Sequence, residues 1–188
     1  MAKTINKWKD KNWYPVKAPE MFEKKEIGDS PAPSEEELVG RTIETSLRDI
    51  TGKRSHNNIR VKFQIKEVEG GTGKAQVKRF NVTRGYIRKN IRKGRSTIKN
   101  TQKIKANGKT LKVTTYAFTV GELHSSQKKE IRKVMEQEME RQAEENDFNS
   151  LIQKMIFGKT ATSLFKKAKE VAPIKRVEIT KCEIERGE

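Results

Sequence analysis

The sequence predicts an α+β fold, in which a curled antiparallel β-sheet or barrel has helices packed on one side and follows an extended N-terminal arm. Residues 39–120 mostly alternate apolar and polar side chains, as half-buried strands do. From 125 to 172 the apolar residues recur at helical spacing, and alternation returns at 174–184. Strands first, helices later and one returning strand favour an α+β arrangement over alternating βαβ units. We therefore expect an arm over 1–38 and a single α+β RNA-binding domain over 39–188.

The N-terminal segment, residues 1–38, holds four of the five prolines and both tryptophans, and no strand or helix period persists in it. This composition predicts an extended arm that crosses a surface instead of folding alone. Trp8, Lys9, Lys11 and Trp13 interleave rings with positive charge, which suits stacking on bases and pairing with phosphates. An equally good alternative is that Trp13 and Tyr14 clamp the arm onto the domain.

The first half of the domain is expected to be β-structure. A half-buried strand is predicted over Val39–Ile50, followed by a polar turn over Thr51–Asn58. Strict alternation over Ile59–Lys66 is the clearest strand pattern in the chain. Glu69–Gly73 is then a turn, and Ala75–Val82 is the partner strand that returns from it.

A short helix is predicted over Arg84–Lys93, with Thr83 as its cap and Gly94 at its end. Ile87 and Ile91 lie one turn apart and are expected to face the core. Basic residues on the rest of the helix predict a positively charged ridge, formed by Arg84, Arg88, Lys89, Arg92 and Lys93.

A β-hairpin is predicted next, from Thr97–Ala106 and Lys109–Val120. The two strands are joined by Asn107-Gly108, the dipeptide that best tolerates the positive φ angles of a two-residue turn. Lysines are spread along both strands, at positions 99, 103, 105, 109 and 112, so the hairpin could enter a nucleic-acid groove.

Three helices and a final strand complete the expected fold. The first helix begins at Ser125 or Ser126 and runs to about Glu145, and the second begins at Asn146 and ends near Gly158. The third covers about Ala161–Ala172, where Pro173 stops it. The last strand, Ile174–Ile184, is expected to have a register break before Cys182.

The charge distribution gives the main indication of function. The 52 residues from Gly70 to Gly121 contain no Asp or Glu and fourteen Lys or Arg, so this quarter of the chain holds +14 of the net +17. A field of one sign repels itself and costs stability, which predicts a polyanionic partner. Nucleic acid is the leading candidate, an anionic membrane surface is a distant second, and a merely solvated face is the bland alternative. The expected RNA contacts are Lys9, Lys11, Trp13, Lys78, Arg79, Arg84, Arg88, Lys89, Arg92, Lys93, Arg95, Lys99, Lys103, Lys105, Lys109 and Lys112.

Motifs for catalysis, cofactors or metals are missing, so no enzyme activity, cofactor or metal is expected. Two Gly-Lys pairs, at Gly73 and Gly158, lack the glycine five positions earlier that a phosphate-binding loop needs. His56 and His124 stand alone, and the single Cys182 excludes an intramolecular disulfide. No apolar stretch approaches the roughly 18 residues that span a bilayer, and we expect a soluble, intracellular protein.

Three stretches resemble the S-three-a family of small-subunit ribosomal proteins of archaea and eukaryotes. They are Asn12–Phe22 followed by Ile27-Gly28, Gly40–Leu47, and Phe165–Ile184, and the string WY-x-V-x-AP-x-MF in the first is specific to that family. The resemblance implies a structural RNA-binding protein on the platform side of the small subunit, near the messenger exit. Its implied partners are the 3′ region of ribosomal RNA, other platform proteins and messenger RNA near the exit, without homo-oligomerisation. The chain lacks the long basic tail and C-terminal extension of eukaryotic members, so it resembles an archaeal form.

Two other functions stay open on the sequence alone. A transiently acting nucleic-acid-processing enzyme or RNA chaperone would be stripped from ribosomal subunits by a high-salt wash, whereas a structural constituent would remain. A free DNA-binding protein would prefer duplex DNA over structured RNA in competition.

Overall fold

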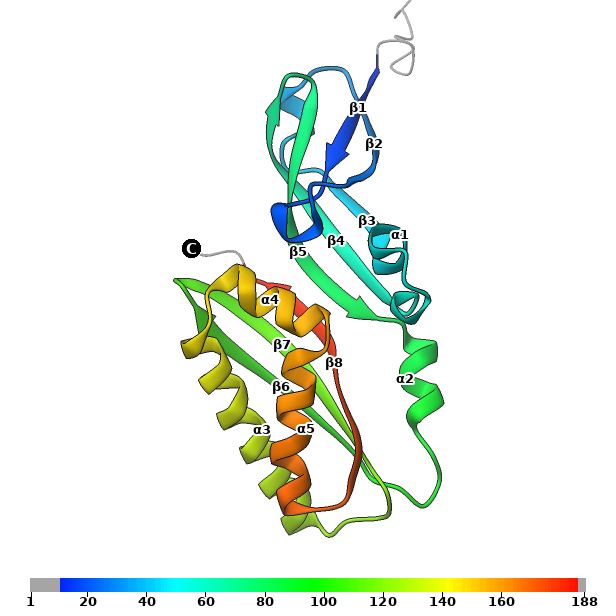
Figure 1. Cartoon of the computed structure of the whole chain (residues 1–188), viewed down its shortest axis with the longest axis vertical. Helices are drawn as coiled ribbons and strands as arrows, with labels where there is room; N and C mark the ends of the chain where they lie inside the picture. The colour runs from blue at the N-terminus through cyan, green and yellow to red at the C-terminus, as the bar shows by residue number, and fades with distance from the viewer. Residues whose placement is uncertain (1–10, 186–188) are drawn as a thin grey trace, which may run out of the picture. The chain divides into compact units, whose positions relative to one another are not determined.

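The computed structural model describes residues 11–185, and the chain divides into two compact units. Unit 1 ends at Lys78 and unit 2 begins at Arg79, and we describe each by itself (Figure 1). The described residues form eight β-strands and five α-helices. The strands pair into one open sheet. Strand β5 belongs to both units, since its first part pairs with β1 and its last part pairs with β8. The predicted α+β class is confirmed, with an open sheet instead of a closed barrel, while the predicted domain boundary at residue 38 stays a prediction.

Unit 1 is built mainly from strands: β1 (Asn12–Lys17), β2 (Glu26–Ala32), β3 (Thr42–Ser46), β4 (Ile59–Glu69) and the first part of β5 (Thr72–Val82). The pairs β1–β2 and β3–β4 are antiparallel, and β4 also pairs with β5. A short parallel pairing joins β1 to β5. The strand predicted from strict alternation is therefore confirmed as β4.

Strands β1 and β2 correct the expectation that the N-terminal segment lacks regular elements within residues 11–38. Prolines hide the pattern, but β2 lies at the end of the strand order, where a missing N–H is tolerated. Val16, Phe22 and Ala32 are buried, and the Phe22 ring meets the Phe63 ring edge-on at 5.6 Å between centroids. This part of the predicted arm is thus packed into the core of unit 1, and the rest lies outside the described residues.

The strand predicted over Val39–Ile50 is too long, because its second half is helical. β3 ends at Ser46, and α1 covers Leu47–Thr51. The Ser46 hydroxyl accepts a hydrogen bond from the Arg48 N–H at 3.2 Å, which caps the helix. At the other end, Lys25 Nζ donates to two backbone carbonyls of α1, both at 2.9 Å, where the helix dipole favours a cation.

Strand β5 changes the side that it buries along its length. In unit 1 its buried positions are odd-numbered, namely Gly73, Ala75 and Val77; in unit 2 they are even-numbered, namely Phe80 and Val82. Because successive side chains of a strand point to opposite faces, this change gives one strand a place in two hydrophobic cores.

Unit 2 contains the predicted hairpin, formed by β6 (Thr97–Ala106) and β7 (Lys109–Thr119), together with β8 (Ile174–Ile184). Asn107 and Gly108 have φ angles of 46° and 75°, as a primed two-residue turn requires. β7 lies between β6 and β8 in an antiparallel arrangement, and the end of β5 pairs with the other edge of β8. The hairpin prediction is confirmed.

A β-bulge confirms the predicted register break in β8. The pairing with β7 shifts between Ile179 and Lys181, which leaves Thr180 as the extra residue. The Thr180 hydroxyl donates to the backbone carbonyl of Thr114 at 3.1 Å. The bulge lets Ile179 and Cys182 both lie on the buried side of the strand.

The three predicted helices of the C-terminal half all form, as α3 (Ser125–Glu145), α4 (Phe148–Ile156) and α5 (Lys159–Val171). Two caps differ by one or two residues from those predicted: His124 precedes α3 and Asp147 precedes α4. The helices lie on one face of β6, β7 and β8 (Figure 1), as predicted. Among the helices of residues 11–185, none combines the length and apolarity that a membrane crossing requires.

Candidate nucleic-acid interface

The helix that was predicted to carry the basic ridge is shorter than expected. α2 covers Arg84–Asn90, and Ile91 already has extended backbone angles and is 47% exposed, so it does not face the core. Ile87 is half-buried. The Ile91 N–H bonds the Arg88 carbonyl, three residues back, as the helix ends. The prediction that Gly94 ends the helix is therefore wrong, although Gly94 does adopt a positive φ of 74° in the loop.

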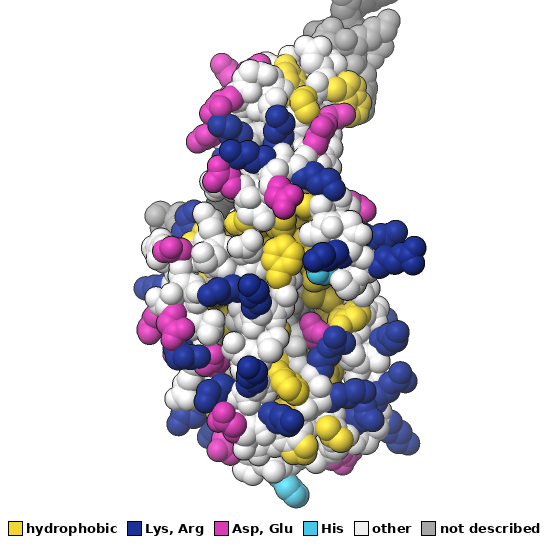
Figure 2. All heavy atoms as spheres, viewed as in Figure 1, with side chains coloured by type: hydrophobic (Ala, Val, Ile, Leu, Met, Phe, Trp, Pro, Cys, Tyr) yellow, Lys and Arg dark blue, Asp and Glu magenta, His cyan; other side chains and the backbone are white. Residues whose placement is uncertain are grey.

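Six cations gather on α2 and the loop that follows it, and we call them the basic ridge. They are Arg84, Arg88, Lys89, Arg92, Lys93 and Arg95. All six are exposed, and none forms an ion pair with another residue of the described range 11–185. Figure 2 shows Lys and Arg side chains gathered over the region of α2. The ridge therefore presents unneutralised positive charge to solvent.

Tyr86 attaches α2 to strand β8. Its hydroxyl donates to Glu178 Oε1 at 3.1 Å, and the Arg176 guanidinium lies 5.7 Å from the centre of its ring. Arg176 in turn bonds the same Glu178 oxygen at 2.7 Å. Burial and the Glu178 charge both raise the pKa of the Tyr86 hydroxyl. Tyr86 thus positions the helix that carries the basic ridge.

The hairpin lysines divide between the two faces of the sheet. Lys99, Lys103, Lys105 and Lys112 are exposed on the face away from the helices, and Lys103 pairs with Glu185 at 2.9 Å. Lys109 differs, because its Nζ lies 4.4 Å from the centre of the Phe148 ring in α4. All five lysines lie along the hairpin as predicted, and four of them share the face away from α3, α4 and α5.

The other predicted contacts are scattered. Lys78 and Arg79 are half-buried on β5, at the end of unit 1 and the start of unit 2. In unit 1, Lys11 is half-buried just before β1, while Trp13 on β1 is 66% exposed. Lys9 lies outside the described residues. Contact of these residues with RNA stays a prediction.

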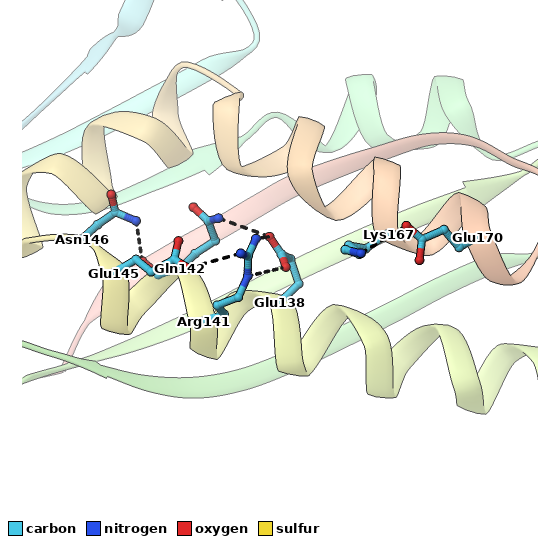
Figure 3. A network of polar contacts seen from close by, with 7 residues as sticks. All are labelled: Glu138, Arg141, Gln142, Glu145, Asn146, Lys167 and Glu170. Carbon is cyan, nitrogen blue, oxygen red and sulfur yellow. Dashed lines mark hydrogen bonds and ion pairs between the residues drawn. The ribbon is translucent and has the colours of Figure 1, made fainter.

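The acid-rich helix α3 contains one buried carboxylate, that of Glu138. Glu138 is 5% exposed and accepts two hydrogen bonds from the Arg141 guanidinium, at 2.7 and 3.0 Å, and one from Gln142 at 3.2 Å. Arg141 also reaches Glu145 at 3.2 Å (Figure 3). Hydrogen bonds from Arg141, aided by that from Gln142, hold the pKa of the Glu138 carboxyl below its ordinary value against the effect of burial. Glu138 is a structural group of the helix.

The remaining candidate groups have local structural roles. His56 Nδ1 lies 2.9 Å from the Thr51 hydroxyl, and burial together with the Lys53 charge lowers the pKa of His56. His124 precedes α3. Cys182 is 2% exposed, and burial raises the pKa of its thiol to about 12, which keeps it protonated and unreactive. Within residues 11–185, no group of three or more His, Cys, Asp or Glu could hold a metal ion.

The sequence patterns missed Tyr116, which lies on the side of β7 away from α3, α4 and α5. It is half-buried, stands opposite Lys99 of β6, and stacks on the Phe118 ring at 6.1 Å between centroids. The sequence could have indicated this position, since Tyr116 is four residues from Lys112 and alternate residues of a strand share a face. Only the confirmed hairpin register shows that the ring and the lysines share a face.

Comparison with known protein families now identifies a ribosomal protein. The model of the Ribosomal S3Ae family matches residues 1–187, and the chain belongs to that family. The resemblance found in the sequence is thereby confirmed.

Several archaeal proteins are similar over most of the chain. The small ribosomal subunit protein eS1 of Methanobrevibacter smithii is 35% identical over 178 residues, which cover 94% of this chain and 92% of the relative. The protein of the same name from Archaeoglobus fulgidus is 35% identical over 186 residues, or 97% and 88% of the two chains. That of Aeropyrum pernix is 36% identical over 182 residues, or 94% and 85%.

Proposed function

We propose that this chain is a structural constituent of the small ribosomal subunit in the cytoplasm. It binds ribosomal RNA on the platform, near the messenger exit, and so supports translation. Membership of a ribosomal protein family and the names of the archaeal relatives support the subunit assignment. The resemblance noted in the sequence supports the position, with neighbouring platform proteins and messenger RNA near the exit as further partners. The role is non-catalytic.

The observation that carries the proposal is the basic ridge. Its six side chains are exposed and unpaired among the described residues, and they lie in a stretch without a single acid from Gly70 to Gly121. Phosphates supply the missing counter-charge, and neutralising them releases condensed counterions. Arginine suits this task because its planar guanidinium can donate two parallel hydrogen bonds to one phosphate.

Such contacts explain how the protein would be positioned on folded RNA. Contacts to phosphates fix the orientation of a protein but carry little sequence information. Double-helical RNA is recognised mostly by its shape and backbone, because its deep major groove is closed to side chains. Tyr86, bound to Glu178 and Arg176, holds α2 against β8 and so presents the ridge on a rigid support.

Replacing three ridge arginines tests the proposal. The variant Arg88→Glu, Arg92→Glu and Arg95→Glu reverses three exposed charges without removing any described hydrogen bond of these side chains. We expect it to be lost from small subunits, measured as the amount of tagged protein that co-sediments with subunits after a high-salt wash. The unchanged chain is expected to remain in stoichiometric amount.

A charge-matched control separates the ridge from net charge. Lys129→Glu, Lys133→Glu and Lys166→Glu alter exposed lysines on the helices of unit 2 by the same total charge. We expect this variant to sediment with the subunit. Normal incorporation of the ridge variant would overturn the assignment of the ridge. Loss of the unchanged chain in high salt would instead favour a transient RNA-processing enzyme or chaperone.

A further inference from the structure

The sheet of unit 2 has one face that α3, α4 and α5 do not cover, and α2 reaches it where Tyr86 contacts Glu178 and Arg176. We call it the open face, and it consists of side chains of β6, β7 and β8 that point away from α3, α4 and α5. They are Lys99, Thr101, Lys103, Lys105, Lys112, Thr114, Tyr116, Arg176, Glu178, Lys181 and Glu183. Each of them is exposed or half-buried, in contrast to the buried residues of opposite parity such as Ile104 and Val113.

Positive charge remains on the open face after its acids are paired. Three ion pairs involve acids on or beside this face: Lys103 with Glu185, Arg176 with Glu178, and Lys181 with Glu183, at 2.9, 2.7 and 2.6 Å. Lys99, Lys105 and Lys112 form no ion pair with a residue of the range that the structure describes.

The strand register places Lys112 between charges of both signs. It stands opposite Lys103 in the hairpin and opposite Glu183 of β8, and like charges directly opposite each other destabilise a sheet. Glu185 pairs with Lys103 and Glu183 with Lys181, so a phosphate over Lys112 would add a further counter-charge.

A ring lies among these charges. Tyr116 is the neighbour of Lys99 across the hairpin and lies two residues from Thr114 and four from Lys112 on the same face of β7. Its ring packs nearly parallel to that of Phe118, with 20° between the planes. Phe118 lies two residues further along β7 on the same face, is 3% exposed, and packs beside the Tyr116 ring. A supported aromatic ring with lysines around it suits a nucleobase, whose flat face stacks while its phosphates meet the cations.

We propose that the open face binds a single-stranded segment of RNA, with one base stacked on Tyr116 and phosphates contacting Lys99, Lys105 and Lys112. The proposal rests on the proposed function and adds a second contact surface to the basic ridge. A single strand is favoured over a duplex because the faces of paired bases are closed by stacking on their neighbours. The ridge, which lacks a free ring, takes folded RNA through its phosphates.

Two RNA probes and two substitutions at one residue test the proposal. Binding of the full chain to a 12-nucleotide unstructured RNA and to a 12-base-pair RNA duplex is measured by fluorescence anisotropy in one buffer. Tyr116→Leu keeps an apolar side chain but removes the ring, and we expect it to weaken binding of the single strand about tenfold while leaving duplex binding within about twofold. Tyr116→Phe keeps the ring, and we expect it to bind both probes as the unchanged chain does.

Surface charge reversals keep the test valid if Tyr116→Leu fails to fold. The double variant Lys99→Glu, Lys112→Glu changes only exposed side chains. We expect it to weaken binding of the single-stranded RNA more than binding of the duplex. Equal loss for both probes, or unchanged single-strand binding in the Leu or the double Glu variant, would overturn the proposal. The triple variant of the basic ridge, Arg88→Glu, Arg92→Glu and Arg95→Glu, is measured beside these. If it binds duplex RNA normally while Tyr116→Leu no longer binds the single-stranded RNA, the assignment of the ridge is wrong and the proposal for the open face is supported.

Discussion

Glu138 illustrates at the scale of one residue how a carboxylate in an acid-rich helix can serve structure. Its side chain is 5% exposed, while that of Arg141, its main partner, is 54% exposed. A buried charge is tolerated only when hydrogen bonds replace its water, and three such bonds reach the Glu138 oxygens (Figure 3). The exposed arginine weakens the electrostatic part of this pairing by solvent screening.

Neutralising this carboxylate should lower stability in a pH-dependent way. We expect Glu138→Gln to lower the free energy of unfolding at pH 7 by about 1–2 kcal/mol, because charge-assisted hydrogen bonds are lost. The pKa of the Glu138 carboxyl is lowered in the folded protein, so the stabilisation is present above its ordinary pKa and disappears as the pH falls through the folded value. Urea unfolding between pH 7 and pH 3 measures both effects.

Glu144→Gln on the exposed side of α3 is the matched control and is expected to change little at any pH. A difference between the unchanged chain and Glu138→Gln that grows on acidification would contradict the assignment, since the sign of the pKa shift would then be reversed.

Among the elements, α2 and the β6–β7 hairpin each depend on a glycine in a different way. Gly85 lies in α2 with ordinary helical geometry, and a Cβ added to it would meet nothing within 4 Å. Gly108 has a φ of +75° in the hairpin turn, a conformation that costs an L-residue about 1–2 kcal/mol. The same chemical change should thus have opposite effects at the two sites.

We expect Gly85→Ala to raise the free energy of unfolding by up to about 1 kcal/mol, because alanine loses less backbone entropy in a helix. Gly108→Ala should lower it by about 1–2 kcal/mol through strain in the turn. Urea denaturation of the two variants beside the unchanged chain measures both values. A destabilising Gly85→Ala would show that the backbone of α2 is not helical at that position.

Sequence patterns predicted most elements, and each failure has an identifiable cause. β4 and the hairpin were visible because a single buried face imposes strict alternation. β1 and β2 were hidden because each contains a proline, Pro15 and Pro31, a residue that argues against a strand when only the sequence is read. α1 was hidden because five residues show no helical period, and only the Ser46 cap marks its start.

For the whole molecule, the unbalanced cations predict a strong dependence of RNA binding on salt. Each phosphate contact adds about 0.7 to 0.9 to the slope of log affinity against log salt concentration. We expect Arg84→Gln, Arg88→Gln and Arg92→Gln together to reduce that slope by about 2 to 3 for a duplex RNA, because three contacts disappear. Binding titrations at several salt concentrations measure it.

Glu138→Gln serves as the control for this series, since it changes a side chain that is buried within unit 2, and its slope should equal that of the unchanged chain. If the arginine variant kept the full slope while losing affinity, the arginines would act through the fold and not through phosphates.

The candidate site was predictable from sequence only in part. Charge composition found the basic ridge, because an acid-free stretch needs no structure to be recognised. It could not show that Lys109 meets Phe148 or that Tyr116 joins the lysines, because these facts depend on strand parity and on helix packing. Composition predicts the kind of partner, whereas register decides which side chains can meet it together.

The change of buried side along β5 has a practical consequence for anyone who wishes to produce the two units separately. A cut after Lys78 would divide β5 between the two fragments. The first fragment would lack residues 79–82 of this strand, and the second would lack residues 72–78. Each recombinant fragment would need its own copy of residues 72–82, one with Phe80 and Val82 made polar and the other with Ala75 and Val77 made polar.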